Sequence, residues 1–360
     1  MKQEELIQKT FGCVRFVYNH FLEERISFYQ KTGQTKKYCQ QSKSLTALRK
    51  ELPWLQEPEY RALQNALRNL DCSYKNFFRR VKCGEKPGFP KYKSKKRGRK
   101  TYTTANNHNV IRIDGNRIHL PKLRYVKASV SRIIPPTHQI INATISQEPS
   151  GKYFVSLCVK YEPDIKERRL DMQNALGLDY SSPHFYVDSE NNVANMPHFF
   201  RADEKRLSKE QRKLSKMKRG SNNFKKQKIK VARAYEKIRN SRTDWQHKES
   251  KRLADKYDYI CVEDINYSGM SRGLHLAKAT NDNAFGQFRW FLSYKLEDRG
   301  KKLITIDKWF PSSKTCRFCG AINNELTLDQ REWNCSCGAH LLRDYNAAIN
   351  ILKRGLQDVS

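Results

Sequence analysis

Residues 311–351 read PSSKTCRFCGAINNELTLDQREWNCSCGAHLLRDYNAAINI, and the organisation of the chain follows from this stretch. Cys316 and Cys319 form a C-x-x-C pair, and Cys335 and Cys337 form a C-x-C pair after fifteen intervening residues. A glycine follows each pair. Four thiolates on two short turns are the ligand set of a tetrahedral zinc ion. The spacing therefore favours a zinc ribbon over four buried free cysteines.

An amphipathic helix is expected directly after the ribbon, in the segment LLRDYNAAINIL. Asp344 lies in its first turn, where the helix dipole favours a carboxylate. The ribbon and the helix together therefore place one acidic side chain at a defined position.

The composition indicates a multidomain protein with a polyanionic partner. A chain of 360 residues is long enough for two or three domains. It carries 70 Lys and Arg residues against 37 Asp and Glu residues, a net charge of +33 that is spread along the sequence. This excess favours nucleic acid over a membrane surface. No apolar run approaches the roughly 18 residues of a spanning helix, and the polar start MKQEELIQKTFG does not predict a secretory signal.

The first third of the chain is expected to be helical. Residues 12–30 and the segment after Leu52-Pro53 place apolar side chains at helical spacing. Lys and Arg residues lie off the second stripe, so one face is apolar and another is basic. Residues 81–101 are rich in Lys, Arg, Gly and Pro, with Phe89 and Tyr92 interleaved. This segment is either a solvated linker or a nucleic-acid contact.

From residue 102 to residue 162 the hydrophobic period changes to two, which is typical of strands. Short strands are expected in VIRID, NRIHL, SVSRI, INATIS and GKYFVSLCVKY. Hairpin turns are expected at Asp114-Gly115-Asn116 and at Pro149-Ser150-Gly151. The segment is predicted to form a small β-barrel or a curled sheet.

A second sheet is expected in the other half of the chain. It begins at NALGLDYSS (residues 174–182) and continues with a hairpin that turns at residues 189–192. DYICVED (258–264) and KLITIDKWF (302–310) predict further strands, with a helix in AFGQFRWFLSYKLEDRG (284–300) between them. Residues 203–256 predict long basic helices with a break at Gly220-Ser221. Their cations favour contact with phosphates over a merely solvated face.

Three acidic residues stand at comparable places. Asp179 ends one apolar strand, Glu263 ends another, and Asp344 opens the helix after the ribbon. In a mixed sheet of the ribonuclease-H kind, strand ends and an adjacent helix can bring such side chains to one edge. Three carboxylates can hold two Mg²⁺ ions for phosphodiester hydrolysis. Asp264 is a rival to Glu263, because strand register alone does not choose between them.

Other chemistries find no support in the sequence. It contains no G-x-x-x-x-G-K-[ST] loop, no G-x-G-x-x-G after a strand, and no His-x-His pair of the kind found in tyrosine-type single-strand transposases. The order Asp, Glu, Asp also differs from the Asp, Asp, Glu order of cut-and-paste transposases on the same fold.

These segments resemble the TnpB family, transposon-encoded RNA-guided nucleases related to the compact type V CRISPR effectors. The most specific pieces are GLDYSS, CVEDINYSG, PSSKTCRFCG, and REWNCSCGAH with RDYNAAINIL, and the resemblance covers nearly the whole chain. It implies that two catalytic Mg²⁺ ions are held by Asp179, Glu263 and Asp344, which favours Glu263 over Asp264. It implies that one structural Zn²⁺ is held by Cys316, Cys319, Cys335 and Cys337.

The resemblance also implies an α+β multidomain fold. This fold has a helical recognition lobe and a β-barrel wedge domain, then a ribonuclease-H-like (RuvC) α/β domain with an inserted zinc ribbon. The implied parts are residues 1–11, first part of the wedge domain; 12–82, helical recognition lobe; 83–165, wedge β-barrel; 166–310, first part of the RuvC-like domain, with basic helices at 203–256; 311–340, zinc ribbon that binds target nucleic acid; and 341–360, last part of the RuvC-like domain.

The implied function is an RNA-guided, Mg²⁺-dependent DNA endonuclease. A guide RNA from the transposon end pairs with one strand of double-stranded DNA beside a short motif, and the displaced strand enters the RuvC cleft. The protein is expected to act as a monomer on one RNA, in the cytoplasm of a bacterium or archaeon and associated with its nucleoid. A catalytically silent RNA-guided repressor, an RNA-independent structure-specific nuclease, and a CRISPR array as the guide source stay open as alternatives.

Two departures from the family pattern bear on the site. Leu341-Leu342-Arg343-Asp344 stands where many relatives have His-Asp-Arg-Asp, so the surroundings of the last aspartate are less polar. The aspartate itself is present, and activity is therefore expected. The second cysteine pair is one residue shorter than C-x-x-C, and His340 is a candidate substitute ligand.

Overall fold

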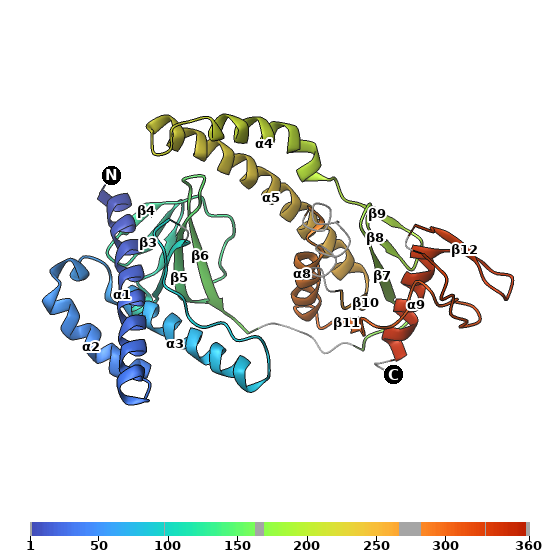
Figure 1. Ribbon diagram of the computed structural model, residues 1–360, viewed down its shortest axis with the longest axis horizontal. Helices are drawn as coiled ribbons and strands as arrows, with labels where there is room; N and C mark the ends of the chain where they lie inside the picture. Colours follow the sequence, from blue (N-terminus) through green and yellow to red (C-terminus); the bar gives the residue numbers. More distant parts are fainter. Residues whose placement is uncertain (1, 97, 163–168, 266–281, 328, 358–360) are drawn as a thin grey trace. The chain divides into compact units, whose positions relative to one another are not determined.

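Two units, residues 1–162 and 163–360, make up the chain, and each has its own apolar core. The computed structural model describes residues 2–96, 98–162, 169–265, 282–327 and 329–357 (Figure 1). The predicted boundary at residues 165 and 166 lies outside the described residues. No helix in the described part of the chain is both long enough and apolar enough to span a membrane.

Three helices open the first unit. They are α1 (Lys2–Thr32), α2 (Tyr38–Glu51) and α3 (Tyr60–Lys82), with a short 3₁₀ helix η1 (Pro53–Gln56) before α3. The predicted apolar stripes of α1 and α3 are largely buried in the core, as their helical spacing requires. Phe78 is the exception, because 53% of its surface is exposed. The sequence analysis did not predict α2, whose buried contribution is limited to Gln41 and Leu45.

Two three-stranded antiparallel sheets follow in the first unit. One has the order β1 (Lys100–Ala105), β5 (Gln139–Gln147), β6 (Tyr153–Lys160). The other has the order β2 (Arg112–Asp114), β3 (Arg117–Leu120), β4 (Arg124–Lys127), and η2 (Asn107–Asn109) precedes it. No pairing joins the two sheets within residues 98–162. These residues therefore contain two separate sheets where a small β-barrel or a curled sheet was predicted.

Local signals predicted the hairpins of this unit better than its strands. Both predicted hairpins form, β2 with β3 and β5 with β6. The strand predicted in SVSRI is wrong, since residues 129–133 form no strand and Ile133 is 94% exposed. Strands β1 and β4 were missed, and β1 pairs with β5 far along the chain, a partner that no local pattern specifies.

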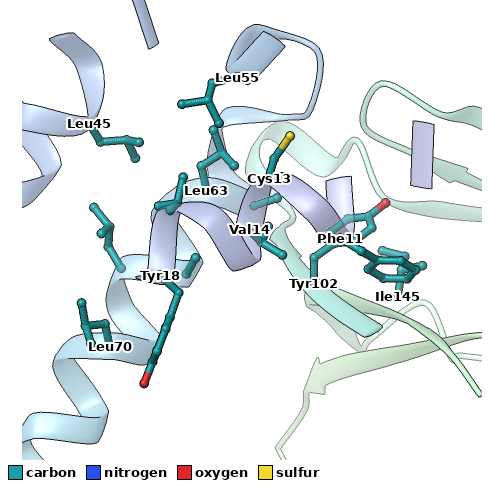
Figure 2. Close-up of a cluster of buried hydrophobic side chains, with 14 of the residues drawn as sticks. Phe11, Cys13, Val14, Tyr18, Leu45, Leu55, Leu63, Leu70, Tyr102 and Ile145 are labelled. Carbon is teal, nitrogen blue, oxygen red and sulfur yellow. The ribbon is translucent and has the colours of Figure 1, made fainter. Parts of the chain in front are cut away.

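One core joins the helices to the sheets of the first unit (Figure 2). Phe11 of α1 meets Tyr102 of β1 edge to face, with 5.7 Å between the ring centroids. Near the start of α1, the Gln8 amide donates to the Tyr153 hydroxyl and to Gln147. The predicted boundary between residues 11 and 12 therefore falls inside a single helix, and residues 2–11 contact the sheet as a helical segment.

A five-stranded mixed sheet forms the centre of the second unit, in the order β11-β10-β7-β8-β9. Its strands are β7 (Ala175–Ser181), β8 (Phe185–Asp188), β9 (Val193–Asn195), β10 (Tyr259–Glu263) and β11 (Lys302–Ile306). Strand β10 runs parallel to both β7 and β11, whereas β7, β8 and β9 form an antiparallel meander. The predicted strands and the predicted hairpin at residues 189–192 are confirmed.

Four helices lie in the described residues of this unit. Helices α4 (Phe199–Ser215) and α5 (Asn222–Lys256) form a hairpin that breaks where Gly220-Ser221 predicted it (Figure 1). The other two are α8 (Phe285–Glu297) and α9 (Arg343–Gln357). Helix α9 lies against β7 at Gly177, where an added Cβ would come 2.2 Å from the Ala348 carbonyl oxygen. Glycine therefore permits the approach that sets the position of α9 and of its first turn.

Candidate active site and metal centre

The four cysteines of the ribbon converge on one point. Their sulfur atoms all lie within 4.8 Å of one another, the only such group of potential metal ligands in the described residues. Cys335 and Cys337 lie in the turn between β12 (Glu332–Asn334) and β13 (His340–Leu342), which pair antiparallel. A glycine with positive φ follows each cysteine pair, Gly320 after the first and Gly338 after the second. Its N–H donates to the carbonyl of the first cysteine of the pair at 2.9 Å. The turns thus direct both thiols of each pair inward.

The sulfur positions fit a tetrahedral zinc ion. The Sγ atoms of Cys316 and Cys337 are 3.8 Å apart, and those of Cys319 and Cys335 are 3.5 Å apart. Zinc–sulfur bonds of about 2.3 Å in a tetrahedron separate the sulfurs by about 3.8 Å. A hydrogen bond from the Cys337 backbone lowers the pKa of Cys335 to about 6, whereas thiol hydrogen bonds within the cluster raise the pKa of Cys319. The crowded thiols therefore favour a thiolate at Cys335, and a metal ion is needed to hold all four as thiolates.

Both ring nitrogens of His340 have partners outside the sulfur cluster. Its Nδ1 lies 2.8 Å from Oδ1 of Asn334, and its Nε2 lies 3.2 Å from the Glu332 carboxylate. The shorter C-x-C pair therefore completes the sulfur cluster without a histidine, and the alternative of His340 as a substitute ligand finds no support in the geometry.

The ribbon is joined to α9 by direct contacts. Strand β13 ends at Leu342, and the Arg343 N–H donates to the Arg331 carbonyl at 2.8 Å. Buried Asn346 accepts from the Arg317 N–H and donates to the Thr315 carbonyl. Asn350, one turn further along α9, donates to the carbonyls of Ser312 and Thr315. The segment that carries the first cysteine pair is thus fixed to the helix that carries Asp344.

The three acidic residues lie in one cleft. Asp179 is in β7, Glu263 ends the parallel neighbour β10, and Asp344 is in the first turn of α9. The register places Val262 opposite Leu178, so Glu263 and Asp179 come next on their two strands. Ser181 points to the same side of β7 as Asp179, and its hydroxyl lies 3.5 Å from the Asp344 carboxylate. We call this space of about 480 Å³ the carboxylate cleft.

Burial and mutual repulsion raise the pKa values of two of these acids. Burial raises the pKa of Asp179 well above its ordinary value, and the carboxylates of Asp344 and Glu263 raise it further. Burial raises the pKa of Glu263 to about 7. Such perturbed carboxyl groups gathered in a cleft are typical of functional sites.

Arginine side chains hold Asp344 from two directions. The Arg343 guanidinium lies 2.9 Å from one carboxylate oxygen, and Arg331, beside strand β12, lies 3.6 Å from the other. The ribbon hairpin therefore reaches the acid directly through Arg331.

Of the two neighbouring acids at the end of β10, Glu263 lines the carboxylate cleft and Asp264 is not among its lining residues. Asp264 is exposed and forms an ion pair with Arg289 of α8 at 2.8 Å. Because successive residues of a strand point to opposite sides, Glu263 turns into the carboxylate cleft and Asp264 turns out of it.

The cleft also contains side chains that the sequence analysis missed. Lys308, Trp309 and Lys314 line it, together with the guanidinium of Arg331. The available signal was the position of Lys308 and Trp309 directly after an apolar strand that runs parallel to β10. Side chains that follow adjacent parallel strands gather at the same sheet edge.

Comparisons with known proteins give the family. A "Putative RNA-guided DNA endonuclease" of Streptomyces pristinaespiralis is 35% identical over 357 residues, which cover 99% of this chain and 87% of that protein. The chain belongs to the TnpB family. Domain models agree with this: "Probable transposase" matches residues 156–273, and "Cas12f1-like, TNB domain" matches residues 285–351. A "Helix-turn-helix domain" model matches residues 1–34, where this TnpB-family chain has the single helix α1.

A second TnpB-family relative and a solved structure extend the match. InsQ of Escherichia coli, also named as a "Putative RNA-guided DNA endonuclease", is 28% identical over 372 residues, which cover 98% of this chain and 89% of InsQ. The protein in the cryo-EM structure of a Cas12f1–sgRNA–target DNA complex aligns with a TM-score of 0.57 at 15% identity. That alignment covers 98% of this chain and 83% of the other. At this identity the likeness shows a shared mixed α/β, multidomain fold.

Proposed function

We propose that this protein is an RNA-guided DNA endonuclease that hydrolyses DNA phosphodiester bonds in its carboxylate cleft. The observation that carries the proposal is that Asp179, Glu263 and Asp344, which are far apart in sequence, meet in one cleft. The two relatives named "Putative RNA-guided DNA endonuclease" match the chain almost end to end. Family membership and the chemistry of the site therefore support the same activity.

The donor set of the cleft suits magnesium. Three carboxylates in a partly buried space repel one another, and divalent cations relieve that repulsion. In our proposal Asp179, Glu263 and Asp344 hold two Mg²⁺ ions. When bound, such a pair supplies an activated water and stabilises the leaving oxygen.

The chain's own residues prepare this site. Arg343 and Arg331 orient the Asp344 carboxylate, while Asn346 and Asn350 hold its helix against the ribbon. We assign one structural Zn²⁺ to the four cysteines, where it would keep the ribbon folded. The proposal thus gives the zinc ion a role in position and none in the chemistry.

The basic surface supports nucleic-acid partners. Helices α4 and α5 expose a dense set of cations along their hairpin. These include Lys205, Arg206, Lys209, Arg212, Lys216, Arg219, Lys225, Lys226, Lys230, Arg233 and Arg239. Surfaces of this kind bind phosphate backbones without reading sequence. Sequence specificity would come from base pairing between a guide RNA and the target strand.

The implied domain roles remain part of the proposal. Residues 1–11 and 83–165 would serve as the wedge domain and residues 12–82 as the recognition lobe, holding a transposon-end RNA and reading a short motif in double-stranded DNA. Residues 166–310 and 341–360 would form the RuvC-like nuclease domain, with residues 311–340 as a ribbon that binds the target. The protein would act as a monomer on one RNA, in the bacterial cytoplasm close to the nucleoid.

The first test is to co-express the protein with its genomic flanks and to sequence the RNA that copurifies. One dominant structured RNA, ending in a segment of about 20 nucleotides that matches flanking DNA, is expected. The resulting complex should cut a matched plasmid in Mg²⁺ but not in EDTA. Cleavage should be lost in Asp179→Ala and retained in the matched control Asp264→Ala.

Two results would contradict the proposal. Copurification of a heterogeneous mixture of cellular RNA would contradict RNA guidance. Branched DNA would then be the substrate to test. A single guide RNA with tight target binding but no cleavage in Mg²⁺ would make the protein an RNA-guided repressor.

A further inference from the structure

Trp309 is an exposed aromatic side chain in the carboxylate cleft. Its exposed fraction is 80%, and it lines the same cleft as Asp179, Glu263 and Asp344. An indole presents a large apolar surface, and leaving it in water forgoes the free energy that burial would provide. Its position therefore suggests a surface that a flat ligand covers.

Hydrogen bonds fix the backbone turn that carries Trp309. The Trp309 N–H donates to Oδ1 of Asp307 at 2.6 Å, and the Phe310 N–H donates to the Asp307 carbonyl at 3.2 Å. Phe310 packs against the small core of Cys261, Ile306 and Ile351. The turn is thus fixed on both sides of Trp309, directly after strand β11.

A cation lies over one face of the ring, which leaves the opposite face for a base. The Lys308 ammonium lies 5.0 Å from the centroid of the Trp309 ring, and Lys314 and Arg331 line the same cleft. An aromatic face with an adjacent cation matches one nucleotide, whose base offers a π-face and whose phosphate carries a negative charge. A base can use such a face only after it leaves the duplex stack, so the matching ligand is a single strand.

We propose that Trp309 and Lys308 form a base-stacking subsite that holds one nucleotide of single-stranded DNA next to the carboxylates. This inference rests on the proposed nuclease function and names the residues that hold the single strand in the cleft. Trp309 stacks on the base, Lys308 pairs with the adjoining phosphate, and the neighbouring phosphodiester bond is presented to the carboxylates. Because stacking does not read base identity, the subsite accepts any sequence.

The test uses the full chain with its copurified guide RNA. Cleavage of a matched duplex in saturating Mg²⁺ is compared for wild type, Trp309→Ala, Trp309→Phe and Lys308→Ala. The control is Trp290→Ala, because Trp290 is 64% exposed on α8 and is not among the residues that line the cleft. We expect Trp309→Ala to slow cleavage by about 10-fold or more. Trp309→Phe should stay close to wild type because it keeps an aromatic face, and Trp290→Ala should be unchanged.

A second measurement is independent of cleavage. The fluorescence of 2-aminopurine in a short single strand is quenched by stacking, and it is followed with each zinc-loaded protein without added Mg²⁺, so that no DNA is cut. Quenching by wild type and Trp309→Phe but not by Trp309→Ala supports the subsite. Equal quenching by Trp309→Ala and wild type, or equal cleavage rates, overturns it and leaves the nuclease proposal intact. If wild type cuts no DNA, the nuclease proposal fails, and quenching alone decides whether Trp309 binds single strands.

Discussion

Asp179 and Glu263 stand side by side on two parallel strands, although 83 residues separate them in the sequence. Leu178 and Val262 form the last registered pair of β7 and β10, and the two acids come next. Each carboxyl group is raised in pKa by burial. Bringing the two together therefore costs free energy, which a site for divalent cations can recover.

In the absence of Mg²⁺, Glu263→Gln should increase the free energy of unfolding at high pH. The folded-state pKa of Glu263 is about 7 against an ordinary value of 4.5, so the folded state binds the extra proton between these two values. Stability then falls as the pH rises through this window, and the cost above pH 7 is about 3 kcal/mol. Chemical unfolding of the zinc-loaded protein without Mg²⁺ should show the gain of Glu263→Gln at pH 8 and its absence at pH 4.5. A gain of equal size at both pH values would exclude this origin.

The same variant should lose activity. Changes to groups that only support metal ligands cost about 10- to 100-fold, so loss of a ligand at Glu263 should slow cleavage by more than about 100-fold. Asp264→Asn is the matched control, since it removes a charge one residue away and outside the cleft. Rates are measured with saturating guide RNA and matched plasmid. If Asp264→Asn proves inactive while Glu263→Gln cuts DNA, our assignment of the two acids is reversed.

Removal of zinc should abolish cleavage without changing the folding of the first unit. Without the metal the ribbon loses its main support, and β13 no longer fixes the first turn of α9, where Asp344 lies. Cys335→Ser should therefore lose both the bound zinc and cleavage, while the folding of residues 1–162 persists. His340→Ala should retain one zinc ion per chain, measured by metal analysis, because its ring faces Asn334 and Glu332. Zinc loss in His340→Ala would restore that histidine as a ligand.

Asn350→Ala should destabilise the second unit. The buried amide donates to two carbonyl groups, and its removal leaves both without that donor. The expected cost is about 1–3 kcal/mol, with a raised Mg²⁺ requirement for cleavage because Asp344 is less firmly placed. The control Asn324→Ala alters an exposed side chain of the ribbon and keeps its backbone contact to Lys314. Equal unfolding free energies for the two variants would show that Asn350 does not clamp α9.

Asp71→Ala should destabilise the first unit. Asp71 pairs with Arg25 at 3.0 Å, and the Arg25 side chain is only 3% exposed. Loss of Asp71 leaves the buried guanidinium without a counter-charge, although its hydrogen bond to Gln41 remains, at a cost of about 3 kcal/mol. The other partner of Asp71 is Lys75, whose side chain is 78% exposed. Lys75→Ala should therefore lower the free energy of unfolding by less than about 1 kcal/mol. Urea unfolding of both variants compares the two contacts directly, and similar losses would contradict the proposed asymmetry.

Sequence patterns predicted several features that depend on neighbours along the chain, although they missed helix α2. Cysteine spacing specified the ligand cluster, glycine and asparagine specified the hairpins, and helical spacing specified the buried stripes of α1 and α3. The same kind of pattern misled in SVSRI, because alternation alone does not show whether a segment has a partner strand.

Only the tertiary structure decided the features that depend on partners far along the chain. Which of Glu263 and Asp264 lines the cleft depends on which side of the sheet each side chain faces. The hydrogen bonds that hold α9 depend on the ribbon lying against Asn346 and Asn350. The continuous core under α1 and β1 and the exposure of Trp309 are of the same kind. The sequence by itself determined which residue types are present and how each segment turns. Long-range packing determined which of those residues meet, since pairing register and helix approach are properties of two segments and not of one.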